Sequence, residues 1–378
     1  MIKKFLGALI LCTGFPIHAQ GLMFECTHNQ LNELEIEVAE YLNTLNINQS
    51  HYQLIREKGY LQLQLKSDPG DNSTLYLRWN PQYAIEDEIL YLPTSQKIKV
   101  VTTVSKKEIA LALMQSGRST RFSGNACNIE ALKDHIGVRQ SIVAWAENLH
   151  WKFPNGSSAQ WNETYWNKGN LHPDKSLSEA MQDFFNNEEL CAVGCYTATK
   201  IVIIQGVLDY YKRIKKDIKT LNLIKATLRS DGDVLVGVES ESMWHDLGNS
   251  DQQKLKTIGK LLKTKHQVPA YNFVPGDWVY FVNPDVKSSE IPGYEGSNSI
   301  YMGRARFDDF YNDNDHHYLY SEKLKEVYNW RFGVFSRSRD YANIRNLNSD
   351  LIEKLSLEPN RGGLVLQNRG VPRLFGFE

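Results

Sequence analysis

The stretch Cys191-Ala-Val-Gly-Cys195-Tyr-Thr-Ala-Thr-Lys-Ile-Val-Ile-Ile204 decides how this chain is interpreted. Apolar residues recur at helical spacing after its second cysteine: Ile201, Ile204, Leu208 and Tyr211. A helix is therefore predicted over 197–216, with Cys195 where the preceding loop ends. The positive end of a helix dipole favours the thiolate, which is the nucleophilic form of cysteine, and helix N–H groups can hold an oxyanion. The alternative is that Cys195 is a small apolar residue packed at the helix start.

The composition is that of a globular protein with an ample core. The chain has 378 residues, enough for two domains, of which 42% are hydrophobic and 23% charged. The formal net charge is −1 and no basic block occurs. Nucleic-acid binding driven by bulk charge is therefore not expected.

Residues 1–19 have the pattern of a secretory signal peptide. A short basic start at Lys3 and Lys4 precedes an apolar run over 5–15, and Ala19 offers a small residue for cleavage. The run is too short to span a bilayer, so we expect no membrane span in the mature chain. A lipoprotein signal at Cys12 is disfavoured because bulky Leu11 precedes it. We expect an exported protein, periplasmic or secreted.

Export would leave four cysteines in an oxidising compartment: Cys26, Cys127, Cys191 and Cys195. Four cysteines allow three pairings, and the sequence does not choose among them. A Cys26–Cys127 bond would leave Cys191 and Cys195 either free or paired. A Cys191–Cys195 bond would block the nucleophile.

Two regions are expected after the signal peptide, at residues 20–120 and 121–378. The first is predicted as a small α+β domain, with a helix over 31–45, strands over 60–65, 74–79 and 98–104, and a hairpin between the first two strands. A linker over 117–127 follows, and the second region is predicted to contain helices over 138–151, 176–185 and 250–262 and a strand within 275–284.

From about residue 138 onward the chain resembles the bacterial spore-coat type of transglutaminase, a protein-glutamine γ-glutamyltransferase. The pieces that carry the resemblance follow the family's order: Arg139-Gln-Ser-Ile-Val-Ala-Trp-Ala-Glu-Asn-Leu149, Thr164-Tyr-Trp166, Leu177-Ser-Glu-Ala-Met-Gln-Asp183, Cys195 with Thr197-Ala198 and Ile201-Val-Ile-Ile204, Gly276-Asp-Trp-Val-Tyr-Phe-Val-Asn-Pro284, and Val371-Pro-Arg-Leu-Phe375. No single piece is specific, whereas their combined order and spacing are.

The resemblance implies an α+β, papain-like core with Cys195 as nucleophile. It also implies a reaction in which the thiolate attacks the side-chain amide of a protein glutamine, ammonia leaves, and a lysine amine takes the acyl group from the thioester. No metal or organic cofactor is needed for this sequence. The expected partners are a glutamine-bearing protein and an amine acceptor.

The chain departs from the family at the groups that should exchange protons with the thiol. Gly194 stands where the family has a glutamate, and Ser297 stands at the second glutamate in Tyr294-Glu-Gly-Ser-Asn298. The family's histidine falls near Phe310. The substitutes weighed for the missing base are Glu295, Asp308, Asp309, His316 and His317, of which Glu295 and Asp309 are preferred; Glu188 and Glu189 are expected to face solvent or cap a helix.

The expected substrate contacts are Tyr294, Asn298 and Trp166, with Trp161 as a further groove residue. A divalent cation at 308–317 is disfavoured because the spacing fits no calcium loop. Two other functions remain open on the same fold. The chain could be an amide hydrolase acting on cell-wall peptide or protein, or an inactive binding module that has lost its base.

Overall fold

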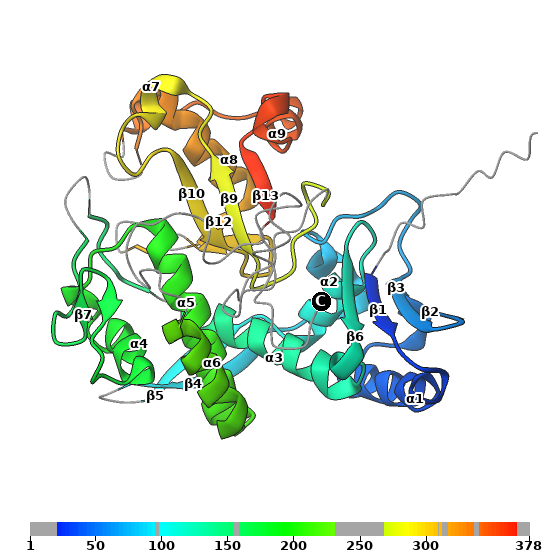
Figure 1. The fold of residues 1–378 in the computed structure, drawn as a ribbon. Helices are drawn as coiled ribbons and strands as arrows, with labels where there is room; N and C mark the ends of the chain where they lie inside the picture. The colour runs from blue at the N-terminus through cyan, green and yellow to red at the C-terminus, as the bar shows by residue number, and fades with distance from the viewer. Residues whose placement is uncertain are drawn as a thin grey trace, which may run out of the picture.

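The structure is a computed structural model, and it describes residues 21–94, 98–147, 149–154, 159–230, 268–308, 310–311, 317–335 and 340–368. Its architecture is α+β (Figure 1). The first elements form a sheet with one helix, a helical layer follows, and the last elements form a second sheet with its own helices. No helix in the described ranges is long and apolar enough to cross a membrane.

The first sheet has the strand order β2-β3-β1-β6. Its elements are β1 (Gly21–Glu25), α1 (His28–Thr44), β2 (Tyr52–Glu57), β3 (Tyr60–Leu65) and β6 (Ser119–Ser123). The central strand β1 pairs antiparallel with β3 and parallel with β6. Helix α1 buries one stripe at spacings of three and four residues, namely Leu31, Leu34, Val38 and Leu42. The apolar period therefore accounts for how this helix packs.

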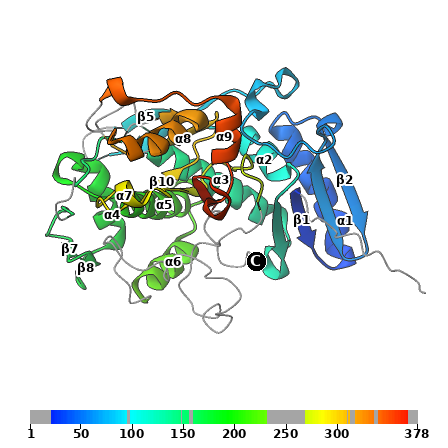
Figure 2. The same cartoon turned by 90° about the horizontal axis from the view of Figure 1, so that it is seen from above.

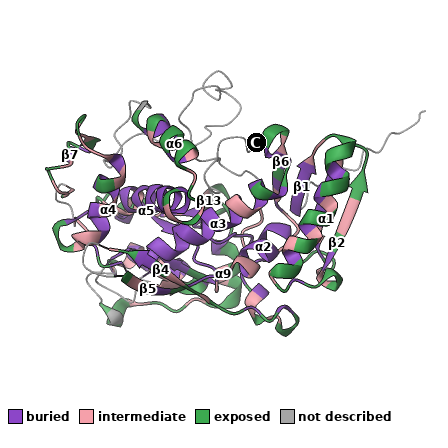
Figure 3. Ribbon diagram, turned by 90° about the horizontal axis from the view of Figure 1, so that it is seen from below, coloured by how far each residue is buried: buried purple, intermediate pink, exposed green. Residues whose placement is uncertain are grey.

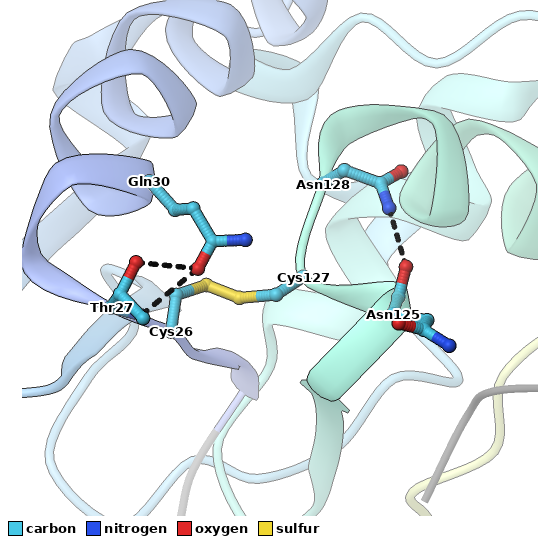
Figure 4. Close-up of a disulfide and its surroundings, with 6 residues drawn as sticks. All are labelled: Cys26, Thr27, Gln30, Asn125, Cys127 and Asn128. Atoms are coloured by element: carbon cyan, nitrogen blue, oxygen red, sulfur yellow. Dashed lines mark hydrogen bonds between the residues drawn. A yellow bond between two sulfur atoms is a disulfide. The ribbon is translucent and has the colours of Figure 1, made fainter.

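A disulfide joins Cys26, just after β1, to Cys127, just before the helix that crosses the molecule (Figure 4). The two Cα atoms are 5.8 Å apart and 101 residues separate the cysteines in sequence. Cys191 and Cys195 are both free thiols. Of the pairings that the sequence left open, the structure therefore has the one that leaves the nucleophile candidate unblocked.

The helical layer is centred on two buried helices, α3 and α5. Its elements are β4 (Glu88–Pro93), β5 (Ile98–Thr103), α2 (Lys106–Met114), α3 (Ile129–Ala146), β7 (Trp166–Asn167), β8 (Asn170–Leu171), α4 (Leu177–Asn186), α5 (Cys195–Asp209) and α6 (Ile218–Ser230). At the crossing of α3 and α5, a Cβ on Gly206 would lie 2.6 Å from the Ile142 Cα. A larger residue at 206 would push the helices apart. Figure 3 shows both helices as largely buried.

The second sheet has the order β10-β9-β13 and lies against α5 (Figures 1 and 2). The last elements are β9 (Trp278–Val282), α7 (Val286–Ser289), β10 (Gly296–Ile300), β11 (Arg306–Asp308), β12 (His317–Leu319), α8 (Tyr320–Asn329), α9 (Ser349–Leu355) and β13 (Val365–Asn368). Strand β10 is the edge strand that meets α5. Asn298 on β10 is the register partner of Tyr280 on β9.

A buried charge cluster ties the first region to the second sheet. Arg118 Nη1 lies 2.6 Å from one Asp277 carboxylate oxygen, and Arg139 Nη1 lies 3.0 Å from the other. All three side chains are at most 2% exposed. Burial disfavours the ionised carboxylate, but the two guanidinium groups outweigh it and hold the pKa of Asp277 below its ordinary value. The aspartate of the Gly276-Asp277 motif is thus a structural anchor.

Several sequence predictions are confirmed with shifted ends. The predicted helix at 31–45 is α1, that at 176–185 is α4, and the helix after the nucleophile candidate is α5 followed by the π-helical turn Tyr210–Ile214. The helix predicted at 138–151 starts earlier, at Ile129, and ends at Ala146. The signal peptide and the helix predicted at 250–262 lie outside the described residues.

The hairpin predicted for 60–65 and 74–79 is wrong. Strand β3 instead pairs with β2, through a turn in which Gly59 has φ +92°. Residues 77–79 form a 3₁₀ turn. The cause lies at Thr74, whose hydroxyl donates to the Phe273 carbonyl and accepts from the Phe273 N–H, which fixes this segment against residues far along the chain.

The division expected at residue 120 falls inside strand β6, which the structure places in the first sheet. One apolar cluster contains residues from both sides of this point, including Leu22, Leu111, Val143 and Ile204. Residues 117–127, expected as a linker, contribute the buried Arg118 and Phe122.

Candidate functional site

Cys195 is the first residue of α5, and Gly194 is its N-cap. The first helical bond runs from the Ala198 N–H to the Gly194 carbonyl at 2.9 Å. The Gly194 backbone is extended, with φ −70° and ψ 162°, so the chain enters the helix directly at the cysteine. Helix N–H groups at this position have no partner within the helix and can donate to an anionic group bound beside them. Cys195 is partly exposed and can be reached from outside.

Strand β10 supplies two hydrogen-bond donors to this sulfur. The Asn298 backbone N–H lies 3.4 Å from Cys195 Sγ, and the Asn298 side-chain Nδ2 lies 3.5 Å from it. Trp278 Nε1 donates to Asn298 Oδ1 at 2.8 Å and so turns the amide nitrogen toward the sulfur. The Trp278 ring meets the Tyr196 ring edge-on, with centroids 5.0 Å apart. Donors directed at sulfur stabilise its anionic form.

The segment before the nucleophile candidate is braced on both sides. Lys152 and Gln160 each bond through their backbones to residues 191–193, at distances of 2.8 to 3.1 Å. The Tyr311 hydroxyl donates to the Val193 carbonyl at 2.9 Å, two residues before Cys195. The approach to α5 is therefore fixed by three separate stretches of chain, which limits movement of the sulfur.

Cys191 is in a different environment from Cys195. It is buried, and its thiol donates to the Asn187 carbonyl at 3.5 Å. Burial, with Asp183 and two nearby glutamates, raises the pKa of the Cys191 thiol to about 12. A thiol of this kind stays protonated at neutral pH and is unreactive.

The candidate bases on the last strands lie in other interactions. The Glu295 side chain is exposed and accepts the Gly293 N–H at 2.9 Å, just before β10 begins. Successive side chains along β10 point to opposite faces of the sheet, so Asn298 points to the sulfur and Ser297 points to the other face. Glu295 lies two residues before Ser297 and therefore falls on the same face as Ser297. Asp308 is fully buried and accepts the Phe310 N–H at 2.8 Å.

His317 Nε2 lies 3.1 Å from Glu147, in a charge cluster that also holds Arg304. Asp309 and His316 lie outside the described residues. Across the described ranges, no carboxylate or imidazole is hydrogen-bonded to Cys195 Sγ, and no group of three His, Cys, Asp or Glu side chains is placed to hold a metal ion.

Of the expected substrate contacts, only Asn298 reaches the sulfur. Tyr294 is buried in the second apolar cluster, with its ring 5.1 Å from Trp330 and 4.1 Å from Phe335. Trp166 is 1% exposed and packs on Phe184, with ring centroids 5.7 Å apart. Trp166 also forms part of the wall of a recess.

Sequence reasoning missed Trp278 and Tyr311. Trp278 follows Asp277 in the quoted strand motif, but the motif does not reveal its hydrogen bond to Asn298. Strand alternation in β10 could have singled out Asn298 over Ser297, had the orientation of the strand been known. Tyr311 carries no local signal, because its partner Val193 is 118 residues away.

A partly exposed thiol at a helix start, facing an antiparallel sheet in an α+β fold, defines a cysteine-based site. The family model described as protein-glutamine gamma-glutamyltransferase matches residues 88–312, more than half of the chain. The chain belongs to this family, as the resemblance predicted. The match begins at β4 and therefore includes residues expected in the first region.

Curated relatives support the same assignment at low identity. A protein-glutamine gamma-glutamyltransferase of Bacillus cereus (strain AH820) is 27% identical over 186 residues, which cover 47% of this chain and 56% of the relative. A second, from Bacillus cereus (strain AH187), is 27% identical over 214 residues, covering 54% and 64%. The chain thus spans a little over half the length of the curated relatives it matches.

One similar solved structure is a transglutaminase from Geobacillus stearothermophilus without its C-terminal extension. It is 23% identical, with a TM-score of 0.35, and the match covers 53% of this chain and 83% of that one.

Proposed function

We propose that this protein is an exported, cysteine-dependent acyltransferase that joins protein glutamine to amines through a thioester on Cys195. The observation that carries the proposal is the free Cys195 thiol, placed at the start of α5 with both Asn298 donors on its sulfur. Family membership supplies the reaction class. A papain-like arrangement of helix and sheet is part of this proposal.

In the proposed reaction, the Cys195 thiolate attacks the side-chain amide carbon of a bound glutamine. The amide oxygen gains negative charge, which N–H groups at the start of α5 and on Asn298 can stabilise. The C–N bond then breaks, and the leaving nitrogen takes a proton and departs as ammonia. An amine attacks the thioester, loses a proton, and forms the new amide while the thiolate is regenerated.

The two proton transfers need a group that accepts and returns a proton. Glu295 is exposed and is bonded to its own turn, so we propose Asp309 as the group for this role. It follows Asp308, and it comes two residues before Tyr311, which bonds to the nucleophile segment.

The test is incorporation of a fluorescent primary amine into a glutamine-rich protein by the reduced enzyme. Cys195→Ala should abolish incorporation, while Cys191→Ala should retain it. Incorporation by Cys195→Ala would contradict the proposal. Ammonia release without amine incorporation would instead identify the protein as an amide hydrolase.

Export is supported by the disulfide, because such bonds persist in oxidising compartments. Mass spectrometry of the N-terminus, after expression in a bacterium and fractionation, tests it. A start after Ala19 in the periplasm or medium would agree with export. An intact Met1 in the cytoplasm would contradict it.

A further inference from the structure

A recess of about 810 Å³ lies beside the segment that leads to Cys195. Its lining includes Trp161, Leu190 and Trp166, of which Trp166 is almost fully buried. Trp161 is partly exposed and Leu190 is 53% exposed, so apolar surface faces the open space. We call this feature the tryptophan recess. Large apolar side chains left exposed around a concave surface are typical of a binding site.

The tryptophan recess is fixed in position relative to the nucleophile. Gln160, in its wall, exchanges two backbone hydrogen bonds with Ala192, at 2.8 and 3.0 Å. Ala192 precedes Cys195 by three residues in an extended segment. Three extended residues span about 10 Å. An extended substrate lying along this segment would therefore place a side chain in the recess about three residues from its reacting glutamine.

The loop that forms the recess is built to hold its shape. Asn162 Oδ1 accepts the Thr164 N–H at 3.0 Å, and the His172 N–H donates to the Tyr165 carbonyl at 2.9 Å. His172 Nε2 lies 3.1 Å from the Glu163 carbonyl oxygen. The loop closes on itself through these bonds, so the recess exists before a substrate arrives.

The charges at the recess do not favour an ionic ligand. Glu163 and Lys168 both line it, both are exposed, and they carry opposite charges. The exposed apolar surface of the recess comes from Trp161 and Leu190, and this surface gains most from an apolar occupant. Apart from the buried Trp166, the other uncharged side chains in the lining are Ala159 and the polar or neutral Gln160, Asn162, Asn167 and His172.

We propose that the tryptophan recess binds an apolar side chain of the glutamine-bearing polypeptide, about three residues from the glutamine, and so selects which glutamines react. The inference rests on the proposed function, because it assigns a substrate contact to that reaction. Binding in the recess would make the enzyme prefer certain substrate sequences through a contact that lies away from Cys195.

The experiment uses glutamine peptides of glycine and serine with a single leucine or phenylalanine, moved through the five positions on each side of the glutamine. Wild-type enzyme should show kcat/KM for amine incorporation roughly tenfold higher when the apolar residue is about three positions away. Trp161→Ala should lose this preference, so that the ratio of kcat/KM between the peptides with and without an apolar residue falls to about one. Leu190→Ser serves as the second variant if Trp161→Ala does not fold.

The matched control is Trp79→Ala, which removes an equally large exposed side chain, 57% accessible, outside the recess. It should keep the full preference. Equal kcat/KM for all peptides, or the same preference in Trp161→Ala, would overturn the inference.

A binding measurement separates this inference from the proposed function. Cys195→Ala protein should bind the preferred peptide more tightly than the glycine-serine peptide, and the difference should vanish in Trp161→Ala. If wild type transfers no glutamine but this difference persists, the proposed function fails and the recess is supported. If wild type is active and Cys195→Ala binds all peptides equally, the recess assignment fails alone.

Discussion

Trp278 donates its indole N–H to the Asn298 side-chain oxygen at 2.8 Å, and this bond decides which end of the amide faces the catalytic cysteine candidate. An asparagine amide can present either oxygen or nitrogen to a neighbour. With its oxygen engaged by the indole, the nitrogen is left for Cys195 Sγ. The tryptophan thus positions a donor without touching the sulfur itself.

Asn298→Ala should lower the rate of Cys195 alkylation below pH 7, because one donor to the sulfur is lost. A hydrogen bond to a charged group contributes about 1.5–3 kcal/mol, so a decrease of roughly tenfold or more is expected. The measurement is the pH profile of iodoacetamide labelling. Ser297→Ala, on the other face of β10, should leave the profile unchanged, and a profile equal to wild type in Asn298→Ala would show that the amide plays no such role.

Cys191→Ala should leave amine incorporation and the labelling of Cys195 intact. The pKa of Cys191, raised to about 12 by burial, keeps this thiol protonated at neutral pH. Mass spectrometry after brief alkylation of the reduced wild type at pH 7 should find the label on Cys195 and not on Cys191. Labelling of both thiols at equal rates would contradict this.

Gly194→Glu should be tolerated and should raise amine incorporation. A Cβ at this position meets no atom within 4 Å, and the backbone is in a region open to any residue. The resemblance places a glutamate here, so the change introduces a proton-exchanging group beside the sulfur. Gly194→Gln has the same size without the acid, and equal rates for the two variants would remove the acid–base explanation.

Asp277→Asn should destabilise the protein by about 3–5 kcal/mol, because two buried guanidinium groups lose their counter-ion. The pKa of Asp277 is lower in the folded state than its ordinary value of 3.8. Its contribution to stability is therefore complete above about pH 4 and is lost as the pH falls through the folded-state pKa.

The prediction for Asp277→Asn is tested by urea unfolding of the variant and of wild type between pH 7 and pH 2.5. The variant should lose less stability on acidification than wild type does. Asp87→Asn breaks a 2.6 Å pair with Arg78 whose side chains are 29% and 22% exposed, and should cost about 1 kcal/mol or less. A similar cost for both variants would show that burial of the Arg118–Asp277 pair does not matter.

The sequence predicted those parts of the fold that depend on local periodicity. Helices α1, α4 and α5 follow from apolar spacing, and the position of Cys195 at a helix start follows from the same pattern. The prediction of a strand at 74–79 is wrong because the Thr74 hydroxyl is hydrogen-bonded to Phe273. The local alternation of apolar and polar residues does not reveal this distant contact. The sequence singled out Cys195 as a nucleophile candidate and Asn298 as an expected substrate contact, whereas the places of Trp278 and Tyr311 depend on contacts between distant segments.

Asn298 is the clearest example of what a comparison of sequences does not predict. An ungapped comparison with the family places Ser297 at the glutamate position, yet the strand turns Asn298 to the sulfur. One residue of offset reverses the face in a strand. Motif spacing therefore identified the strand, and the fold shows that Asn298 is the residue on it that donates to the sulfur.

The contact between Arg118 and Asp277 also sets an order of events during synthesis. These residues are 159 positions apart, so at 5–20 residues per second the ribosome needs roughly 8–30 s to make the second after the first. During that interval the carboxylate that neutralises Arg118 has not been made. The positive charge of Arg118, directly before β6, is therefore unpaired with Asp277. Until the later strands are made, Arg118 stays in water, and the side of the first region that they cover stays open. The nascent chain is therefore expected to be exposed to proteases and chaperones until β9 has been made.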